Sequence, residues 1–221
     1  GVGGTYSFSN LPPNTWTIQI QVAEGKMITG LEKIAGGHDA RAQAWGHNPL
    51  RSWEEGIMIW EVADDPVEPK LLGRFRTGGV GTHRNFYAGG RYVHLCAHMP
   101  GIKGHCYVIV DIQDPSHPKE VSRWWWPGQN VAAGESGNTP GSLHGPPYVV
   151  GDRAWLSYGR EGGVLLDISD VRAPKLVSRF AIGDFGSVLG AHTYMPIPER
   201  NLAVCSTEAI FEEGLDSANF I

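Results

Sequence analysis

Short hydrophobic runs, each followed by an acid and a turn, recur roughly every 50 residues along the chain. Three such segments begin at residues 56, 106 and 162 and read GIMIWEVADDPVEPKLLGRF, CYVIVDIQDPSHPKEVSRWW and GGVLLDISDVRAPKLVSRFA. A short apolar run between turn residues is typical of a buried strand. Aspartate begins turns and proline interrupts strand pairing, so each segment predicts an inner strand, a turn and an outer strand.

The residues before each segment repeat as well, reading THRNFYAGGRYVHLCAH, LHGPPYVVGDRAWLSYG and, in a fourth copy, AHTYMPIPERNLAVCST. Each reads as strand, turn and strand, which predicts hairpins over 83–97, 144–158 and 192–206. Two hairpins per unit make four antiparallel strands, the unit of a β-propeller blade. We therefore expect an all-β protein, a β-propeller of four-stranded antiparallel blades.

The strands YVIVDI and VLLDIS, each followed by an aspartate and then Pro-Lys, resemble the LVIVD repeat. The resemblance covers residues 56–75, 82–125 and 142–181, and part of 190–208. It implies a propeller of several blades, in a family whose members mostly lack an assigned biochemical role. The first copy departs from the pattern, because WEV replaces VDI and its turn has one extra residue.

The blades are expected over 38–76, 82–126 and 142–182, with a partial blade over 190–221. Residues 1–37 read as edge strands, with alternating hydrophobic residues on both sides of a turn at Pro12–Asn14. Such a hairpin would help close the ring; the alternative is the end of a carboxypeptidase-regulatory-like β-sandwich. Residues 39–55 predict a loop or one short helix. Because propellers close with about 4–8 blades, closure needs the N-terminal strands, a second copy of the chain or further sequence.

Composition narrows the function. Lys and Arg total 18 against 23 acids, a net charge of −5, which argues against nucleic-acid binding. No apolar run approaches the ~18 residues of a membrane helix, so no membrane span is expected. The three cysteines form no CxxC pair and no disulfide framework. The chain opens on a polar GVGG rather than a signal peptide, which is expected of a processed chain or a fragment and leaves its location unassigned.

Histidines carry the candidate chemistry. His83, His144 and His192 each stand 12 residues before a hydrophobic residue of the following strand, so they occupy one register at the start of the innermost strand. His38 stands 23 residues before its repeat's acid, as His144 does. Equivalent positions of successive blades form a ring around the axis, so the imidazoles should converge. A multi-His site predicts Fe, Cu or Zn rather than Mg or Ca.

Two more residues are candidates for catalysis. Glu208 follows the fourth hairpin and is expected to orient an imidazole or act as a general base; the alternative is a solvated loop acid. Arg160 lies in the same register of the third unit and would either clamp an anionic substrate or pair with a neighbour of Glu161. His94, Cys96 and His98 share a strand face near Cys106, which indicates either packing between blades or a second metal cluster.

Two function classes follow from these residues. The first is a metal-dependent enzyme acting on a small organic molecule at the axial histidines, by oxidation or by a lyase- or hydrolase-type reaction. The alternative is a non-catalytic interaction scaffold whose histidines are structural. The shared register favours the enzyme, and the fold class alone favours the scaffold.

Overall fold

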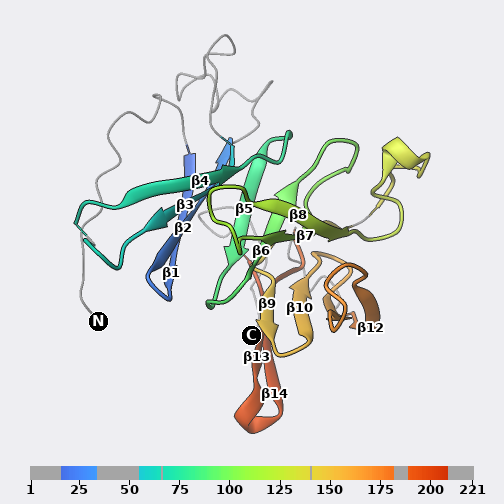
Figure 1. Ribbon diagram of the computed structural model, residues 1–221. Coiled ribbons are helices and arrows are strands. Elements are labelled where there is room, and N and C mark those ends of the chain that lie inside the picture. The colour runs from blue at the N-terminus through green and yellow to red at the C-terminus, as the bar shows by residue number, and fades with distance from the viewer. Residues whose placement is uncertain (1–15, 34–54, 66, 140, 182–188, 209–221) are drawn as a thin grey trace, which may run out of the picture.

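The computed structural model describes residues 16–33, 55–65, 67–139, 141–181 and 189–208 (Figure 1). Within these ranges the regular structure consists of strands and two short 3-10 turns, η1 (Val131–Ala133) and η2 (Pro198–Arg200). All strand pairs are antiparallel. The expected all-β class is confirmed.

The first four strands pair in chain order as one antiparallel meander. They are β1 (Trp16–Ala23), β2 (Lys26–Lys33), β3 (Gly56–Glu61) and β4 (Lys70–Phe75). The β1–β2 turn lies at Glu24–Gly25, where both residues have positive φ. The strand β2 has no counterpart among the elements that the sequence pattern predicts. The turn predicted at Pro12–Asn14 lies outside the described residues. So do residues 39–54, for which a loop or helix was expected.

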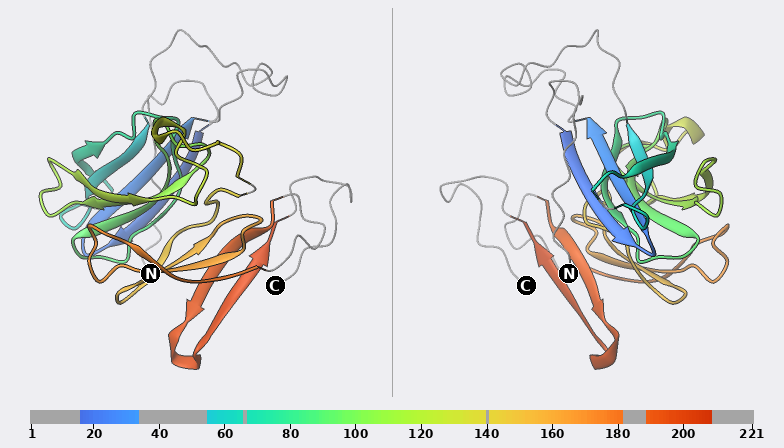
Figure 2. Two further views of the ribbon diagram at one scale, coloured as in Figure 1. Left: turned by 90° about the vertical axis from the view of Figure 1, so that its right-hand side faces the viewer. Right: turned by 60° about the vertical axis from the view of Figure 1, so that its left-hand side comes forward.

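Two further meanders follow, and a hairpin ends the described chain. The second comprises β5 (Gly81–Phe86), β6 (Tyr92–His98), β7 (Cys106–Asp111) and β8 (Lys119–Trp124). The third comprises β9 (Tyr148–Val150), β10 (Arg153–Ser157), β11 (Gly163–Asp167) and β12 (Lys175–Phe180). The hairpin is β13 (Ala191–Ile197) with β14 (Leu202–Thr207), and it projects away from the other sheets (Figure 2).

One residue pair, Glu32 with Gly81, joins the first two meanders into a sheet of eight strands. The third meander and the β13–β14 hairpin form separate sheets of four and two strands. The three predicted hairpins correspond to β5–β6, β9–β10 and β13–β14. The predicted inner strands correspond to β3, β7 and β11. The described strands do not close into a barrel or ring, so the structure bears out the strand pattern and not the propeller.

The repeated acid caps the turn after each inner strand. Asp111 accepts a hydrogen bond from the Gln113 amide at 2.8 Å and pairs with Arg91 at 2.6 Å. Asp167 accepts from the Ser169 amide at 2.8 Å and lies 3.0 Å from the Arg153 guanidinium. Each aspartate thus accepts a hydrogen bond from a backbone amide of the turn and also pairs with an arginine. Arg91 directly precedes β6, and Arg153 is the first residue of β10. The acid of this motif is explained by local structure alone.

The core lies on both faces of β7. Cys106, Val108 and Val110 pack into a cluster with the first meander, whereas Tyr107 and Ile109 pack into a cluster with the third. All five side chains are fully buried. Strand residues alternate between faces, so a strand covered on both sides reads as an unbroken hydrophobic run. This double burial accounts for the YVIV sequence and fixes the second and third meanders face to face.

Candidate metal centre

Two of the predicted histidines sit on β-bulges. In the β5–β6 pair the register shifts between Thr82 and Arg84, so His83 is the extra residue. In the β13–β14 pair it shifts between Ala191 and Thr193, so His192 is the extra residue. A bulge bends its strand and re-aims the side chain of the extra residue. The two histidines therefore share a register and also the same local distortion.

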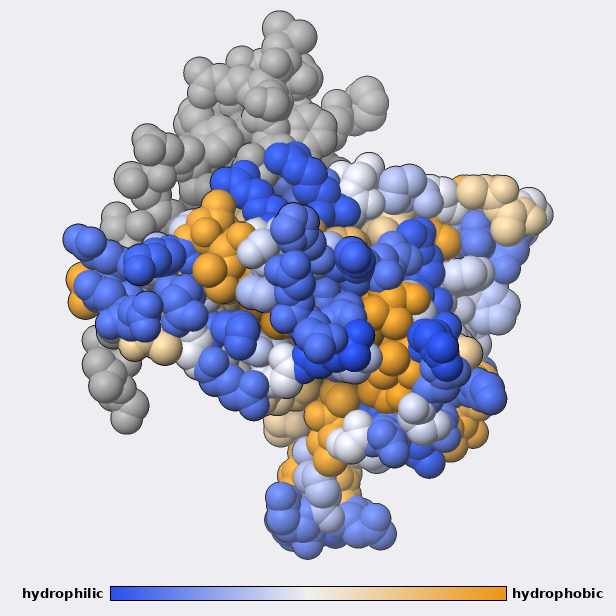
Figure 3. Space-filling model, viewed as in Figure 1, coloured by the Kyte–Doolittle hydropathy of each residue, from blue (hydrophilic) through white to orange (hydrophobic). Residues whose placement is uncertain are grey.

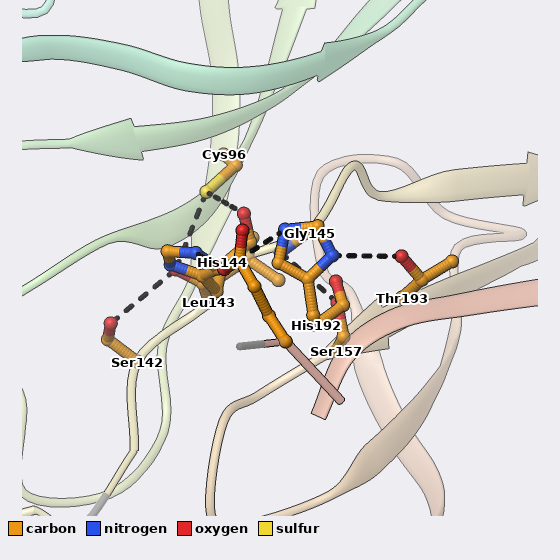
Figure 4. Close-up of polar contacts among 9 residues, drawn as sticks. Cys96, Ser142, Leu143, His144, Gly145, Ser157, His192 and Thr193 are labelled. Atoms are coloured by element: carbon orange, nitrogen blue, oxygen red, sulfur yellow. Dashed lines mark hydrogen bonds and ion pairs between the residues drawn. The ribbon is translucent and has the colours of Figure 1, made fainter. Parts of the chain in front are cut away.

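His144 lies just before β9 and is held by Ser157 at the end of β10. The His144 amide donates to the Ser157 carbonyl at 3.1 Å, and the Gly145 amide donates to the Ser157 hydroxyl at 3.1 Å. That hydroxyl donates to the His192 carbonyl at 2.6 Å (Figure 4). A Cβ at Gly145 would clash with the His192 carbonyl oxygen, so glycine is required there. One buried serine thus fixes the two histidine segments against each other.

The side chains of His144, His192 and Glu208 converge. His144 Nε2 lies 3.1 Å from Glu208 Oε2, and His192 Nε2 lies 3.5 Å from the same oxygen. One ligand atom from each residue falls within 4.8 Å of the other two. Thr193 Oγ1 lies 3.0 Å from His192 Nδ1 (Figure 4), whereas the nitrogen near Glu208 is Nε2. The threonine contact orients the imidazole so that Nε2 faces the carboxylate.

His83 lies beside this cluster without completing it. Its ring centroid is 4.6 Å from that of His144, and the rings of His144 and His192 are 5.0 Å apart. His105 stacks on the other side of His83 at 5.2 Å. The four imidazoles form a row, and the described ligand atoms close enough to share one ion come from His144, His192 and Glu208. Sequence reasoning missed His105, which directly precedes an inner strand.

The surroundings favour neutral imidazoles. Burial, reinforced by the neighbouring His83 and His192, lowers the pKa of His144 to about 4, although Glu208 opposes this shift. Burial also lowers the pKa of His192, with Arg84 and His83 adding to the effect and Glu208 opposing it. A neutral imidazole is the form that binds a metal.

The geometry fits a transition-metal ion. Two ligand atoms bonded to one ion at ~2.1 Å stand about 3.0–3.4 Å apart for octahedral or tetrahedral angles. The 3.1 Å distance from His144 to Glu208 falls within that spacing, and the 3.5 Å distance from His192 lies just above it. His192 Nε2 is also buried and makes no hydrogen bond, since Glu208 at 3.5 Å is within ion-pair reach but outside hydrogen-bond geometry. A buried polar atom without a partner is costly, and a metal ion would satisfy it.

A cavity of about 290 Å³ opens beside the cluster, and His144 is part of its wall. Its described lining is otherwise made of small, hydroxyl-bearing or aliphatic residues and one lysine: Lys103, Gly104, Thr139, Gly141, Ser142, Gly159 and Leu189. The volume is at the small end of the range for ligand pockets. Of the three residues in the cluster, His144 is the one that the described lining includes.

The remaining candidates lie elsewhere. His38 falls outside the described residues. Arg160 is exposed in the turn after β10, next to Gly159 of the cavity wall. His94 is buried with its Nδ1 2.7 Å from the Tyr107 hydroxyl, and His98 Nδ1 accepts from the Val80 amide at 3.3 Å. In the described part of the chain, that strand face packs between sheets and contributes to no metal-ligand group.

No protein-family model matches the chain, and a search of curated proteins finds no relative. Neither comparison bears on the LVIVD resemblance. Among the described residues, no helix has the length and hydrophobicity to cross a membrane.

Proposed function

We propose that this chain is a metal-dependent enzyme acting on a small organic molecule, with His144, His192 and Glu208 as the ligands of a divalent transition metal. The observation that carries the proposal is the convergence of two imidazoles and one carboxylate, with ligand atoms within 4.8 Å, at the wall of a cavity. Two histidines and one carboxylate form a ligand set used by zinc hydrolases and by non-haem iron enzymes. Both leave coordination positions open.

The chain's own residues divide the work at such a site. When bound, the ion would supply a Lewis acid and lower the pKa of a water molecule. Thr193 orients His192, and Ser157 sets the spacing of the two histidine segments. His83 packs against the His144 ring and limits its movement. The ligand set suits Zn or Fe best, and Cu is the remaining member of the expected group.

We further propose that the chain folds as a β-propeller and belongs to the LVIVD-repeat class. Three four-stranded meanders in chain order, with the same bulge in β5 and β13, support repeated blades. In a propeller the first strand of each blade faces the axis. Residues from equivalent bulges would then meet at one place, as His83 and His192 do around His144.

Metal content tests the proposal. The purified protein is dialysed against a chelator and then reloaded with Zn²⁺, or with Fe²⁺ under anaerobic conditions. Elemental mass spectrometry should then find one metal ion per chain. The variants His144→Ala, His192→Ala and Glu208→Gln should each lower the affinity at least 100-fold. His117→Ala, an exposed histidine paired with Asp114 at 2.9 Å, is the matched control and should retain the ion.

The scaffold alternative has one observation in its favour. A His144 Nε2–H can donate directly to Glu208 at 3.1 Å, which satisfies both groups without an ion. If the wild-type protein binds no more transition metal than the His144→Ala, His192→Ala and Glu208→Gln variants do, the histidines are structural. The interaction scaffold then becomes the better account.

A further inference from the structure

We infer that the cavity beside His144 binds the anionic group of its substrate at Lys103, which makes the substrate class a small carboxylate or similar organic anion. That the bound anion is a substrate rests on the proposed function. Binding of the anion by the cavity does not, because it needs no metal ion. Lys103 is the one fully cationic side chain among the described lining residues, and none of them is an acid.

One acid behind the cavity wall is already paired. Glu161 is buried, and its carboxylate pairs with the Arg179 guanidinium at 2.8 Å. Glu161 backs onto Gly141 of the cavity wall rather than lining the cavity itself. Lys103 therefore faces the cavity without a competing carboxylate among the described lining residues. Lys103 is exposed, but an ammonium group at the wall of a hollow attracts an anion more strongly than the same group on a flat surface.

The backbone that carries Lys103 is rigidly placed. Gln129 is fully buried, and its side-chain amide donates to the Lys103 carbonyl at 2.7 Å and to the His105 carbonyl at 3.0 Å. Its side-chain oxygen accepts from the Trp126 amide at 2.8 Å and from the Tyr158 hydroxyl at 3.0 Å. The Lys103 amide donates to the Gln129 carbonyl at 2.8 Å. A buried amide with both donors and both acceptor sites satisfied holds this segment in one position.

Two closely packed glycines shape the cavity wall. Gly104 has φ +71°, and a Cβ there would press against the Ser142 side chain. A Cβ at Gly141 would clash with the Tyr158 carbonyl oxygen. The segment after β6 can approach the segment before β9 because Gly104 lacks a side chain, and the segment before β9 can approach the end of β10 because Gly141 lacks one. The result is a pocket with a cation at one point and His144 at another, which suits a substrate that is anionic at one end.

Benzoate and benzamide, which share a shape and differ in charge, provide the probe. Calorimetric titrations use the metal-free protein, so that the carboxylate cannot be captured by an ion. We expect wild-type protein to prefer benzoate, and Lys103→Met to weaken benzoate binding about tenfold while leaving benzamide unchanged. Lys175→Met, an exposed lysine on β12, makes the same change in net charge and should leave both affinities unchanged.

Three results would overturn the inference: equal affinities for both probes, an unchanged benzoate affinity in Lys103→Met, or loss of the preference in Arg160→Met instead. Metal loading is measured on separate, metal-reloaded samples of the same variants. Lys103→Met should load metal as the wild type does. If the His144, His192 and Glu208 variants also load normally, the metal proposal fails while the anion preference stands or falls by the titrations alone.

Discussion

At the scale of single residues, the site depends on groups that are not themselves ligands. Ser157 is fully buried, and its hydroxyl both accepts from Gly145 and donates to the His192 carbonyl. The register of the histidines allowed their convergence to be predicted from the sequence. The role of Ser157 could not be predicted, nor could the approach of one Glu208 oxygen to both imidazoles, because both depend on which strand ends meet in space.

Replacing Ser157 by alanine should lower metal affinity about 10–100-fold, the range typical of residues that orient metal ligands. The unfolding free energy should fall by about 1–3 kcal/mol, because the Gly145 amide loses its partner while buried. Isothermal titration with Zn²⁺ and urea denaturation measure the two effects. Ser178→Ala, on the exposed strand β12, is the control. An unchanged affinity in Ser157→Ala would show that this hydroxyl does not position the histidines.

His94 makes stability depend on pH. Burial lowers its pKa to about 4. The unfolded chain takes up this proton near the ordinary pKa of about 6.5, so the stabilisation is complete above that value and is lost as the pH falls toward 4. His94→Gln should therefore lose about 2 kcal/mol less than the wild type between pH 7 and pH 5, measured by urea denaturation. Equal losses in both proteins would contradict this assignment.

At the scale of elements, strands marked by an apolar run and a following aspartate could be predicted from the sequence. Strands without that local pattern could not. The inner strands β7 and β11 have continuous apolar runs ended by an aspartate, and they lie where predicted. The segment KMITGLEK of β2 lacks both features, and its place between β1 and β3 is set by pairing with residues distant in sequence. Bulges, likewise, are properties of a strand pair and cannot be seen in one strand.

The aspartate of the repeat should stabilise its own turn. Asp111→Asn keeps the shape but weakens the bonds to Arg91 and the Gln113 amide. Because this pair is partly exposed, we expect a loss of only about 0.5–1.5 kcal/mol in unfolding free energy, with metal binding unchanged. Thermal and urea denaturation would measure it. Asp64→Asn, in an exposed turn, should cost less; if it costs as much, the turn cap is not what the motif provides.

At the scale of the whole molecule, burial is uneven. β7 is covered on both faces, whereas every residue of β12 is exposed, with Leu176 and Val177 each about half exposed. Hydrophobic surface also gathers over β9–β10 and on the stem of the β13–β14 hairpin (Figure 3). The proposed metal ligands bridge these regions, since His144 lies just before the third meander, His192 lies on the hairpin and Glu208 directly follows it.

Hydrogen exchange should follow this gradient. Amides of β6 and β7 are expected to exchange slowest, by global unfolding, and those of β12, β13 and β14 fastest, by local opening. Adding Zn²⁺ should slow exchange selectively around β13 and β14, because the ion would tie the hairpin to the third meander. Mass spectrometry of peptides resolves these segments. Uniform slowing, or none, would show that the ion does not link the two.

Anomalous X-ray scattering from crystals grown with Zn²⁺ or Co²⁺ tests the central claim most directly. We predict one anomalous peak about 2.0–2.2 Å from a ring nitrogen of His144, a ring nitrogen of His192 and a carboxylate oxygen of Glu208. The peak should disappear in crystals of Glu208→Gln grown under the same conditions. A peak held by other residues, or no peak although wild-type crystals diffract well, would contradict the account.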